Sequence, residues 1–144
     1  MADMLYTIVN AAVLPGWLLL VFAPRWKWTT SLITSVLIPF VLGLVYIALL
    51  VANWPVLLSA GTFMHLSDVG KLFANEYCLL AGWVHYLAFD LVVGTWEVRD
   101  AKQVGLPHWA ILPCLVLSFL LGPTGLVCYL LLRWTMTRRV LIEE

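Results

Sequence analysis

Long apolar stretches constrain this chain more than any other feature of its sequence. They cover residues 5–23, 32–52, 77–96 and 109–132, and a membrane-spanning helix needs roughly 20 predominantly apolar residues. Of the 144 residues, 63% are hydrophobic and 11% are charged, whereas a soluble domain carries about 25% charged residues. The sequence therefore predicts an all-α integral membrane protein: one membrane domain over residues 1–144, folded as a four-helix bundle.

The segment between the second and third stretches is too polar to cross a bilayer. Residues 56–75 contain several charged and small polar side chains. Val69, Leu72 and Phe73 fall at i, i+3 and i+4, which gives a helix over residues 67–75 one apolar face. We expect a short helix that lies on the membrane surface between spans 2 and 3.

The charges leave the orientation of the predicted spans open. Four spans place both termini on one side, and the eight Lys and Arg residues then divide equally between the two sides. The first helix often dominates, and its flanking cations favour an outside amino terminus. The amino end lacks the basic region of a cleavable signal peptide. We expect a multi-pass protein of a bacterial inner membrane or a photosynthetic membrane.

The third stretch is the one with ionisable residues in its apolar body. Acidic and aromatic residues recur along it at seven-residue intervals: Glu76, Trp83, Asp90 and Glu97. A seven-residue step returns to within about 20° of the same helix face, so the four form one stripe about 31 Å long. That length is close to the hydrocarbon thickness. The stripe therefore places Asp90 inside the membrane.

An acid at this depth must face protein or water, and intramembrane acids are functional candidates by default. Tyr86, four residues before Asp90, can contact it. We expect the two side chains and Trp83 to border a slot that holds a long apolar ligand. The alternative is a structural hydrogen bond from Asp90 to another helix, for example to Asn10 or Thr34.

His85 allows several interpretations. It lies about 140° around the helix from Asp90, so the two side chains do not share a face. Ala81 and Ala88 lie beside it, and small residues let another helix or a flat pigment approach. Ligation of a pigment metal is one interpretation, and a hydrogen-bonded packing histidine is the commoner one.

Other polar and helix-breaking residues have simpler interpretations. Arg99, Asp100 and Lys102 are expected in a solvated turn at the membrane surface, whereas Glu97 continues the Asp90 stripe. Gly94 is expected to pack against a neighbouring helix or to border the ligand. Pro123 must break the fourth stretch, and a break at depth is either a packing kink or part of a binding site.

Several function classes find no support in the sequence. It contains no zinc-ligand spacing, catalytic-triad order or phosphate-binding loop, so we predict no metal and no cofactor. The net charge is zero, which gives no indication of nucleic acid. The three cysteines (Cys78, Cys114 and Cys128) are interpreted as small packing residues.

The chain resembles the family named after abscisic acid-deficient 4. The resemblance rests on the W-x-H-x-L-x-x-D-L core within residues 82–94, on the Pro-His-Trp run at 107–109, and on the apolar run at 119–126 that contains Gly-Pro-Thr-Gly. Shorter matches occur at residues 14–15, 23–24 and 68–73. The similarity covers nearly the whole chain.

This resemblance implies a role in carotenoid chemistry. Plant members of the family are needed to convert violaxanthin into neoxanthin, an isomerisation that opens an epoxide and creates an allene. The reaction gives one proton to the epoxide oxygen and takes one from the neighbouring polyene carbon. Asp90, His85 and Glu97 match these acid-base roles in residue type, with Trp83, Tyr86, Gly94 and Pro123 as candidate ligand contacts.

Two classes of function therefore stay open. One is a xanthophyll isomerase, and the other is a non-catalytic subunit that binds pigment or assembles with a larger photosynthetic complex. The expected partners are the lipid bilayer, a carotenoid or other long apolar ligand, and a pigment–protein complex or a second copy of the chain.

Overall fold

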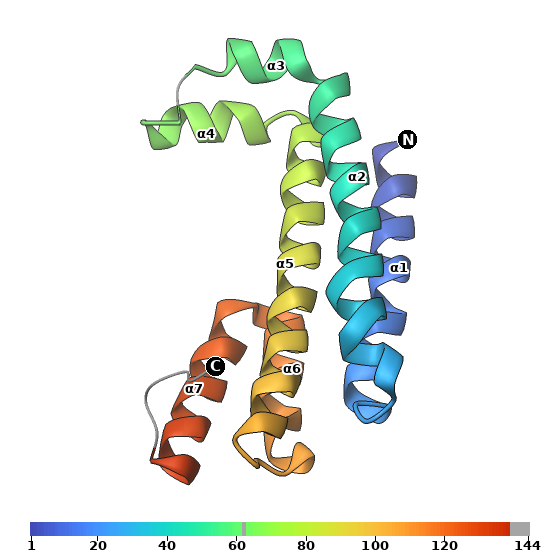
Figure 1. Ribbon diagram of the computed structural model, residues 1–144. Coiled ribbons are helices and arrows are strands. Elements are labelled where there is room, and N and C mark those ends of the chain that lie inside the picture. The colour runs from blue at the N-terminus through green and yellow to red at the C-terminus, as the bar shows by residue number, and fades with distance from the viewer. Residues whose placement is uncertain (62, 139–144) are drawn as a thin grey trace.

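The computed structural model describes residues 1–61 and 63–138. In these residues it contains helices and no strand. The elements in chain order are α1 (Ala2–Phe22), η1 (Thr29–Leu37), α2 (Ile38–Ala52), α3 (Trp54–Ser59), α4 (Leu66–Phe73), α5 (Glu76–Gln103), α6 (His108–Leu121) and α7 (Pro123–Thr137). Figure 1 shows α1, α2 and α5 side by side, with α3 and α4 projecting sideways from the upper ends of α2 and α5, and with α6 and α7 beside the lower half of α5.

Among the described residues, three helices are long and apolar enough to cross a membrane. They are α1 with 21 residues, the continuous helix Thr29–Ala52 with 24 residues, and α5 with 28 residues. The first three predicted stretches are therefore confirmed as long apolar helices. The second begins with the wide π-helical turns of η1, where the Thr34 hydroxyl donates to the Thr29 carbonyl at 2.9 Å.

Helix α5 is the centre of the fold. Of the residues in its 18-residue apolar segment, 56% are buried, against 28% for the corresponding segment of α1 and 11% for that of Thr29–Ala52. Asn75 begins it, because its side-chain oxygen accepts from the backbone N–H groups of Tyr77 and Cys78 at 3.0 and 3.1 Å. A Cβ at Gly94 would stand 2.8 Å from the Trp17 ring, so a small residue there lets α1 pack closely against α5.

Residues 109–132 do not form one helix. Helix α6 ends at Leu121, Gly122 adopts φ 51 and ψ −106, and α7 turns back along α6. A Cβ at Gly125 would stand 2.1 Å from the Ser118 backbone nitrogen, so glycine is required where the two helices meet. The predicted four-helix bundle is not confirmed, since α6 and α7 have 14 and 15 residues and a span needs roughly 20.

The hairpin reverses the direction of the last described helix, α7. The described chain starts at the upper end of the bundle, and α7 runs back towards the lower end (Figure 1). Residues 139–144 lie outside the described part of the chain, so the expectation that both termini lie on one side is not tested, but the start of α1 and the end of α7 lie at opposite ends of the bundle. The turn at Gly122 accounts for this difference, because it sends α7 back to the end from which α6 starts.

An arm of two short helices projects from the upper end. The predicted helix over residues 67–75 is confirmed as α4, while α3 was not predicted. Both extend to one side from the upper ends of α2 and α5 (Figure 1). A Cβ at Gly82 would stand 3.2 Å from the Phe73 ring, which shows how closely α4 packs on α5. The place of the arm on a membrane surface stays a prediction.

Candidate functional site

An apolar cleft of about 500 Å³ opens between α1, α4 and α5. Four aromatic residues from these three helices line it: Tyr6, Phe73, Trp83 and Tyr86. The Trp83 ring lies 5.7 Å from that of Tyr6 and 5.4 Å from that of Tyr86, centre to centre. Two of the residues predicted to contact a ligand, Trp83 and Tyr86, therefore share one cavity.

Hydrogen bonds from α1 hold the central ring of this cleft. The indole N–H of Trp83 donates to the Asn10 side-chain oxygen at 3.2 Å. The Asn10 amide in turn donates to the Tyr6 carbonyl at 2.7 Å. Asn10 thus pairs with Trp83 and not with Asp90, the partner considered from the sequence. The one polar group of the indole is thus paired, and the apolar part of the Trp83 ring borders the cleft, where an apolar ligand can contact it.

Asp90 lies one turn below Tyr86, where the tip of the hairpin meets α5. A Cβ at Gly122 would stand 2.9 Å from the Asp90 Oδ1 atom and 2.9 Å from the Tyr86 ring. The Asp90 carboxyl is half-buried, and its Oδ2 atom has no hydrogen-bond partner among the described residues. Asp90 thus faces protein, as expected, and it is close enough to Tyr86 for the two to interact.

Glu97 lies on the same face of α5, deeper in the lower half. Its side chain is fully buried, and Oε1 accepts from the Ser118 hydroxyl of α6 at 2.8 Å. Oε2 has no partner among the described residues. Glu97 does not line the cleft, so its direct contact is with the hairpin.

Asp100 forms a buried ion pair that was not predicted. Arg133 of α7 donates from Nε to the Asp100 Oδ2 atom at 2.7 Å, and each side chain is 3% exposed. The Tyr129 hydroxyl donates to the same oxygen. The expectation that Asp100 lies in a solvated turn is wrong, because α7 folds back over it. The four-residue spacing of Tyr129 and Arg133, which puts both on one helix face, was a usable signal.

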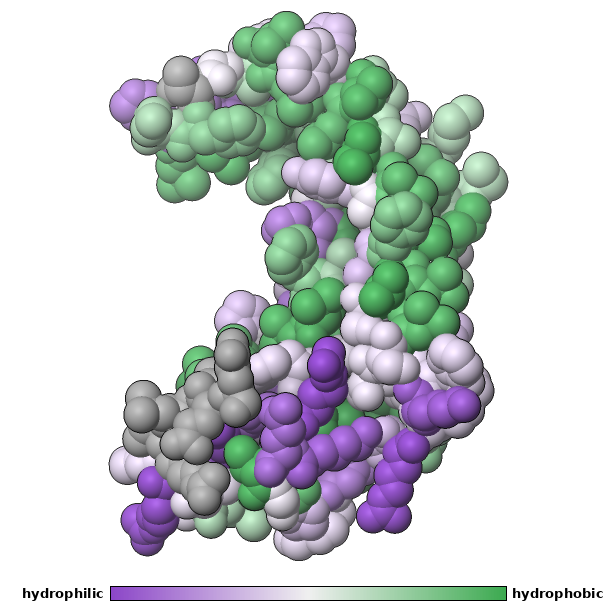
Figure 2. Space-filling view, viewed as in Figure 1, coloured by the Kyte–Doolittle hydropathy of each residue, from purple (hydrophilic) through white to green (hydrophobic). Residues whose placement is uncertain are grey.

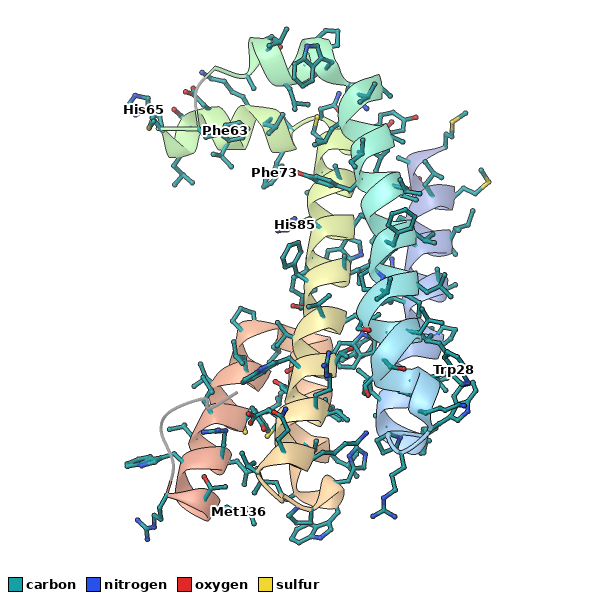
Figure 3. The ribbon with its side chains drawn as sticks, in the orientation of Figure 1. Trp28, Phe63, His65, Phe73, His85 and Met136 are labelled. Atoms are coloured by element: carbon teal, nitrogen blue, oxygen red, sulfur yellow. The ribbon has the colours of Figure 1, made fainter. Side chains whose placement is uncertain are left out.

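His85 lies in a different place from Asp90. Its ring is exposed, 4.5 Å from that of Phe89 and 5.8 Å from that of Tyr46, centre to centre. Figure 3 shows it pointing to the side on which the α3–α4 arm projects. There it lines a second cleft of about 480 Å³ between α2, the arm and α5. The structure therefore does not bring His85 and Asp90 into one site.

The remaining predicted residues lie outside the cleft. Gly94 is buried beneath Trp17, which is a packing position. Pro123 is exposed at the start of α7, next to the Gly122 tip that meets Asp90. Across residues 1–61 and 63–138, no three His, Cys, Asp or Glu side chains are grouped so as to hold a metal ion.

Comparison with known proteins identifies the family. A family model described as ABA DEFICIENT 4-like matches residues 4–129. The chain belongs to this family. The resemblance inferred from residues 82–94 is thereby confirmed. The matched region runs from α1 into α7, so it includes most of the cleft, Asp90 and most of the hairpin.

The chain is also similar to a plant protein. Protein ABA DEFICIENT 4, chloroplastic, of Arabidopsis thaliana is 28% identical over 136 residues, which is 89% of this chain and 60% of that protein. The chain thus spans about three fifths of the length of this relative. No solved structure matches the chain.

Proposed function

We propose that this protein binds a carotenoid in the cleft between α1, α4 and α5 and isomerises it with Asp90 as the proton-transferring group. One observation carries the proposal: Tyr86 lines the cleft and also lies against Gly122 together with Asp90. Asp90 does not itself line the cleft, but it lies one helical turn from Tyr86, and its Oδ2 atom has no partner among the described residues. The volume of about 500 Å³ falls within the range of ordinary ligand pockets.

The chemistry requires one proton in and one proton out. Protonated Asp90 gives its proton to the epoxide oxygen as the ring carbon–oxygen bond breaks. The carboxylate then takes a proton from the neighbouring polyene carbon, whose electrons form the new double bond of the allene. Atoms and charge balance without a redox partner, and Asp90 returns to its protonated form. An acid kept from bulk water suits this cycle, because its neutral form is favoured in apolar surroundings.

The other predicted catalytic residues support this site indirectly or not at all. Glu97 contacts Ser118 of α6, so it holds the hairpin whose tip meets Asp90. His85 belongs to the second cleft. That exposed histidine favours the alternative function, a non-catalytic subunit whose pigment lies against His85 and Phe89.

We further propose that α1, Thr29–Ala52 and α5 cross the membrane and that α6–α7 enters it from the lower side and returns. Irregular backbone at depth is tolerated where protein covers it, and the Gly122 tip is buried. Most described cations then lie at the lower end: Arg25, Lys27, Arg99, Lys102, Arg133 and Arg138. Figure 2 shows hydrophilic residues gathered there.

This charge distribution predicts the orientation. Among the described cations, Lys71 of α4 is at the upper end, so the positive-inside rule places the lower end inside and the amino terminus outside. Reporter fusions at the amino terminus and after Arg138 should label opposite sides of the membrane. Labels on the same side would overturn the re-entrant hairpin.

The catalytic proposal is tested in a bacterial strain that accumulates epoxy-carotenoids. The wild-type chain, Asp90→Asn and the control Asp68→Asn are expressed, and pigments are separated by chromatography. Asp68 is a suitable control because it pairs with Lys71 on α4, outside the cleft. Asp90→Asn should lower isomer formation by about 100-fold or more, while Asp68→Asn leaves it unchanged.

Each other outcome has a defined meaning. Equal product from wild type and Asp90→Asn rejects Asp90 as the proton-transferring group. Pigment that copurifies with both forms without conversion supports the non-catalytic subunit instead. If the wild-type chain yields no product and retains no pigment, carotenoids are rejected as its ligands.

A further inference from the structure

A third cleft, of about 280 Å³, lies at the lower end of the bundle, away from Asp90 and from His85. It is formed where the loop after α1 meets the end of α5 and the start of α6. Its polar side chains are Arg25, Lys102 and His108. Within the described part of the chain, no acidic residue lines it.

The cationic groups of this cleft have donors to spare. Lys102 donates one of its three ammonium protons to the Pro24 carbonyl. Arg25 makes no side-chain hydrogen bond or ion pair to a described residue, and its positive charge repels that of Lys102. A guanidinium has five N–H donors in a fork that matches phosphate oxygens. An anion between these two cations would relieve their repulsion and use the free donors.

His108 lines the cleft at the start of α6. Its Nε2 atom lies 2.9 Å from the Val21 carbonyl oxygen. Because a carbonyl only accepts, Nε2 must carry the hydrogen of this bond, and Nδ1 is left as the other polar atom of the ring. The bond to Val21 also fixes the ring between α1 and α6.

The surroundings place this cleft at headgroup depth. Trp26 and Trp28 follow Arg25, and Trp109 follows His108, and each of these indoles is at least 45% exposed. Exposed tryptophan rings beside cations are typical of the membrane–water interface. A ligand that presents an anionic group at this depth and apolar chains above it is an anionic phospholipid.

We infer that the lower cleft is a binding site for the phosphate group of an anionic membrane lipid, held by Arg25 and Lys102. The inference rests on the proposed membrane topology and is independent of carotenoid chemistry. Basic pockets between membrane helices bind acidic headgroups through the same contacts. A retained lipid there would tie the loop after α1 to the start of the hairpin.

The site is tested by native mass spectrometry of the full chain released from nanodiscs that contain phosphatidylglycerol in phosphatidylcholine. The wild type should retain one phosphatidylglycerol. Arg25→Gln combined with Lys102→Gln should lower that retention by about tenfold or more, because two charge-assisted contacts are lost. Neutral diacylglycerol should not be retained, and inorganic phosphate alone should bind too weakly to displace the lipid.

Arg99→Gln is the matched control, because Arg99 is exposed at the same end of α5 but does not line the cleft. It should retain phosphatidylglycerol like the wild type. An equal loss in Arg99→Gln would show diffuse attraction to the whole basic end and overturn the site. Equal retention in the double variant, or equal retention of diacylglycerol, would overturn it as well. The reporter fusions described above test the topology separately.

Discussion

The upper and lower halves of α5 face different surroundings. Residues between Glu76 and Tyr86 border the apolar cleft, and Trp83 there is 37% exposed. Residues 91–103 are enclosed by α1 and by the α6–α7 hairpin, and Glu97 and Asp100 are buried. Both halves carry acids. The lower acids bond to Ser118 and Arg133 of the hairpin, whereas Asp90, at the boundary, faces Tyr86 and the tip of the hairpin.

The site therefore has two parts. The lower half of α5 and the hairpin form a supporting part, which we call the frame, and the upper half of α5 forms the ligand-facing surface. Polar contacts in the lower half fix the hairpin on α5, so the Gly122 tip is held against Asp90. The upper half keeps its aromatic surface open. A functional acid needs rigid support from neighbouring elements, and here the support comes from the half of α5 that no ligand needs to reach. Changes in the two halves should therefore have different consequences.

Gly125→Val should have the largest effect on folding. Its Cβ would stand 2.1 Å from the Ser118 backbone nitrogen, and backbone cannot move aside as a flexible side chain does. We expect no folded, monodisperse protein in detergent, as measured by fluorescence-detected size-exclusion chromatography. Gly43→Val is the control, since a Cβ at Gly43 meets nothing within 4 Å. Normal elution of Gly125→Val would contradict the close α6–α7 contact.

Arg133→Met should come next. It leaves the buried Asp100 carboxylate without its cation, and breaking a buried ion pair costs about 3–5 kcal/mol. Thermal unfolding in detergent should show a large loss of stability, while Arg99→Met on the exposed face of α5 should change little. Similar melting of the two variants would mean that the ion pair does not hold the hairpin.

Gly82→Leu addresses the upper half. The added side chain would collide with the Phe73 ring, 3.2 Å from the Cβ position, and would occupy the cleft. Overpacking of this kind costs about 1–3 kcal/mol. The protein should still fold but should lose copurifying carotenoid, measured by its absorption spectrum. Gly70→Leu, where a Cβ meets nothing within 4 Å, should keep the pigment. Bound pigment in Gly82→Leu would place the ligand elsewhere.

Asp90→Asn should have the smallest effect on stability. The amide keeps the shape of the carboxyl, and the variant removes an acid whose Oδ2 atom has no partner among the described residues. We expect a change in unfolding free energy of less than about 1 kcal/mol, measured by the same melting assay. A loss as large as that of Arg133→Met would show that Asp90, like Asp100, belongs to the frame.

Residue patterns predicted the parts of the site that depend on one helix. The seven-residue spacing correctly placed Trp83, Asp90 and Glu97 on one face of α5, and the four-residue spacing correctly paired Tyr86 with Asp90. The same geometry separated His85 from Asp90. What each of these faces meets could not be predicted, because Phe73, Ser118 and Gly122 come from distant parts of the chain.

The apolar stretches by themselves determined the three long helices, and the residue motifs determined the family. Only the tertiary structure showed that residues 109–132 form two helices, because hydropathy is the same for one long helix and for two that fold back on each other. That decision depends on the backbone angles of Gly122 and on the close approach of Gly125 to Ser118. Both are contacts across the hairpin, which a linear pattern of apolar residues does not contain.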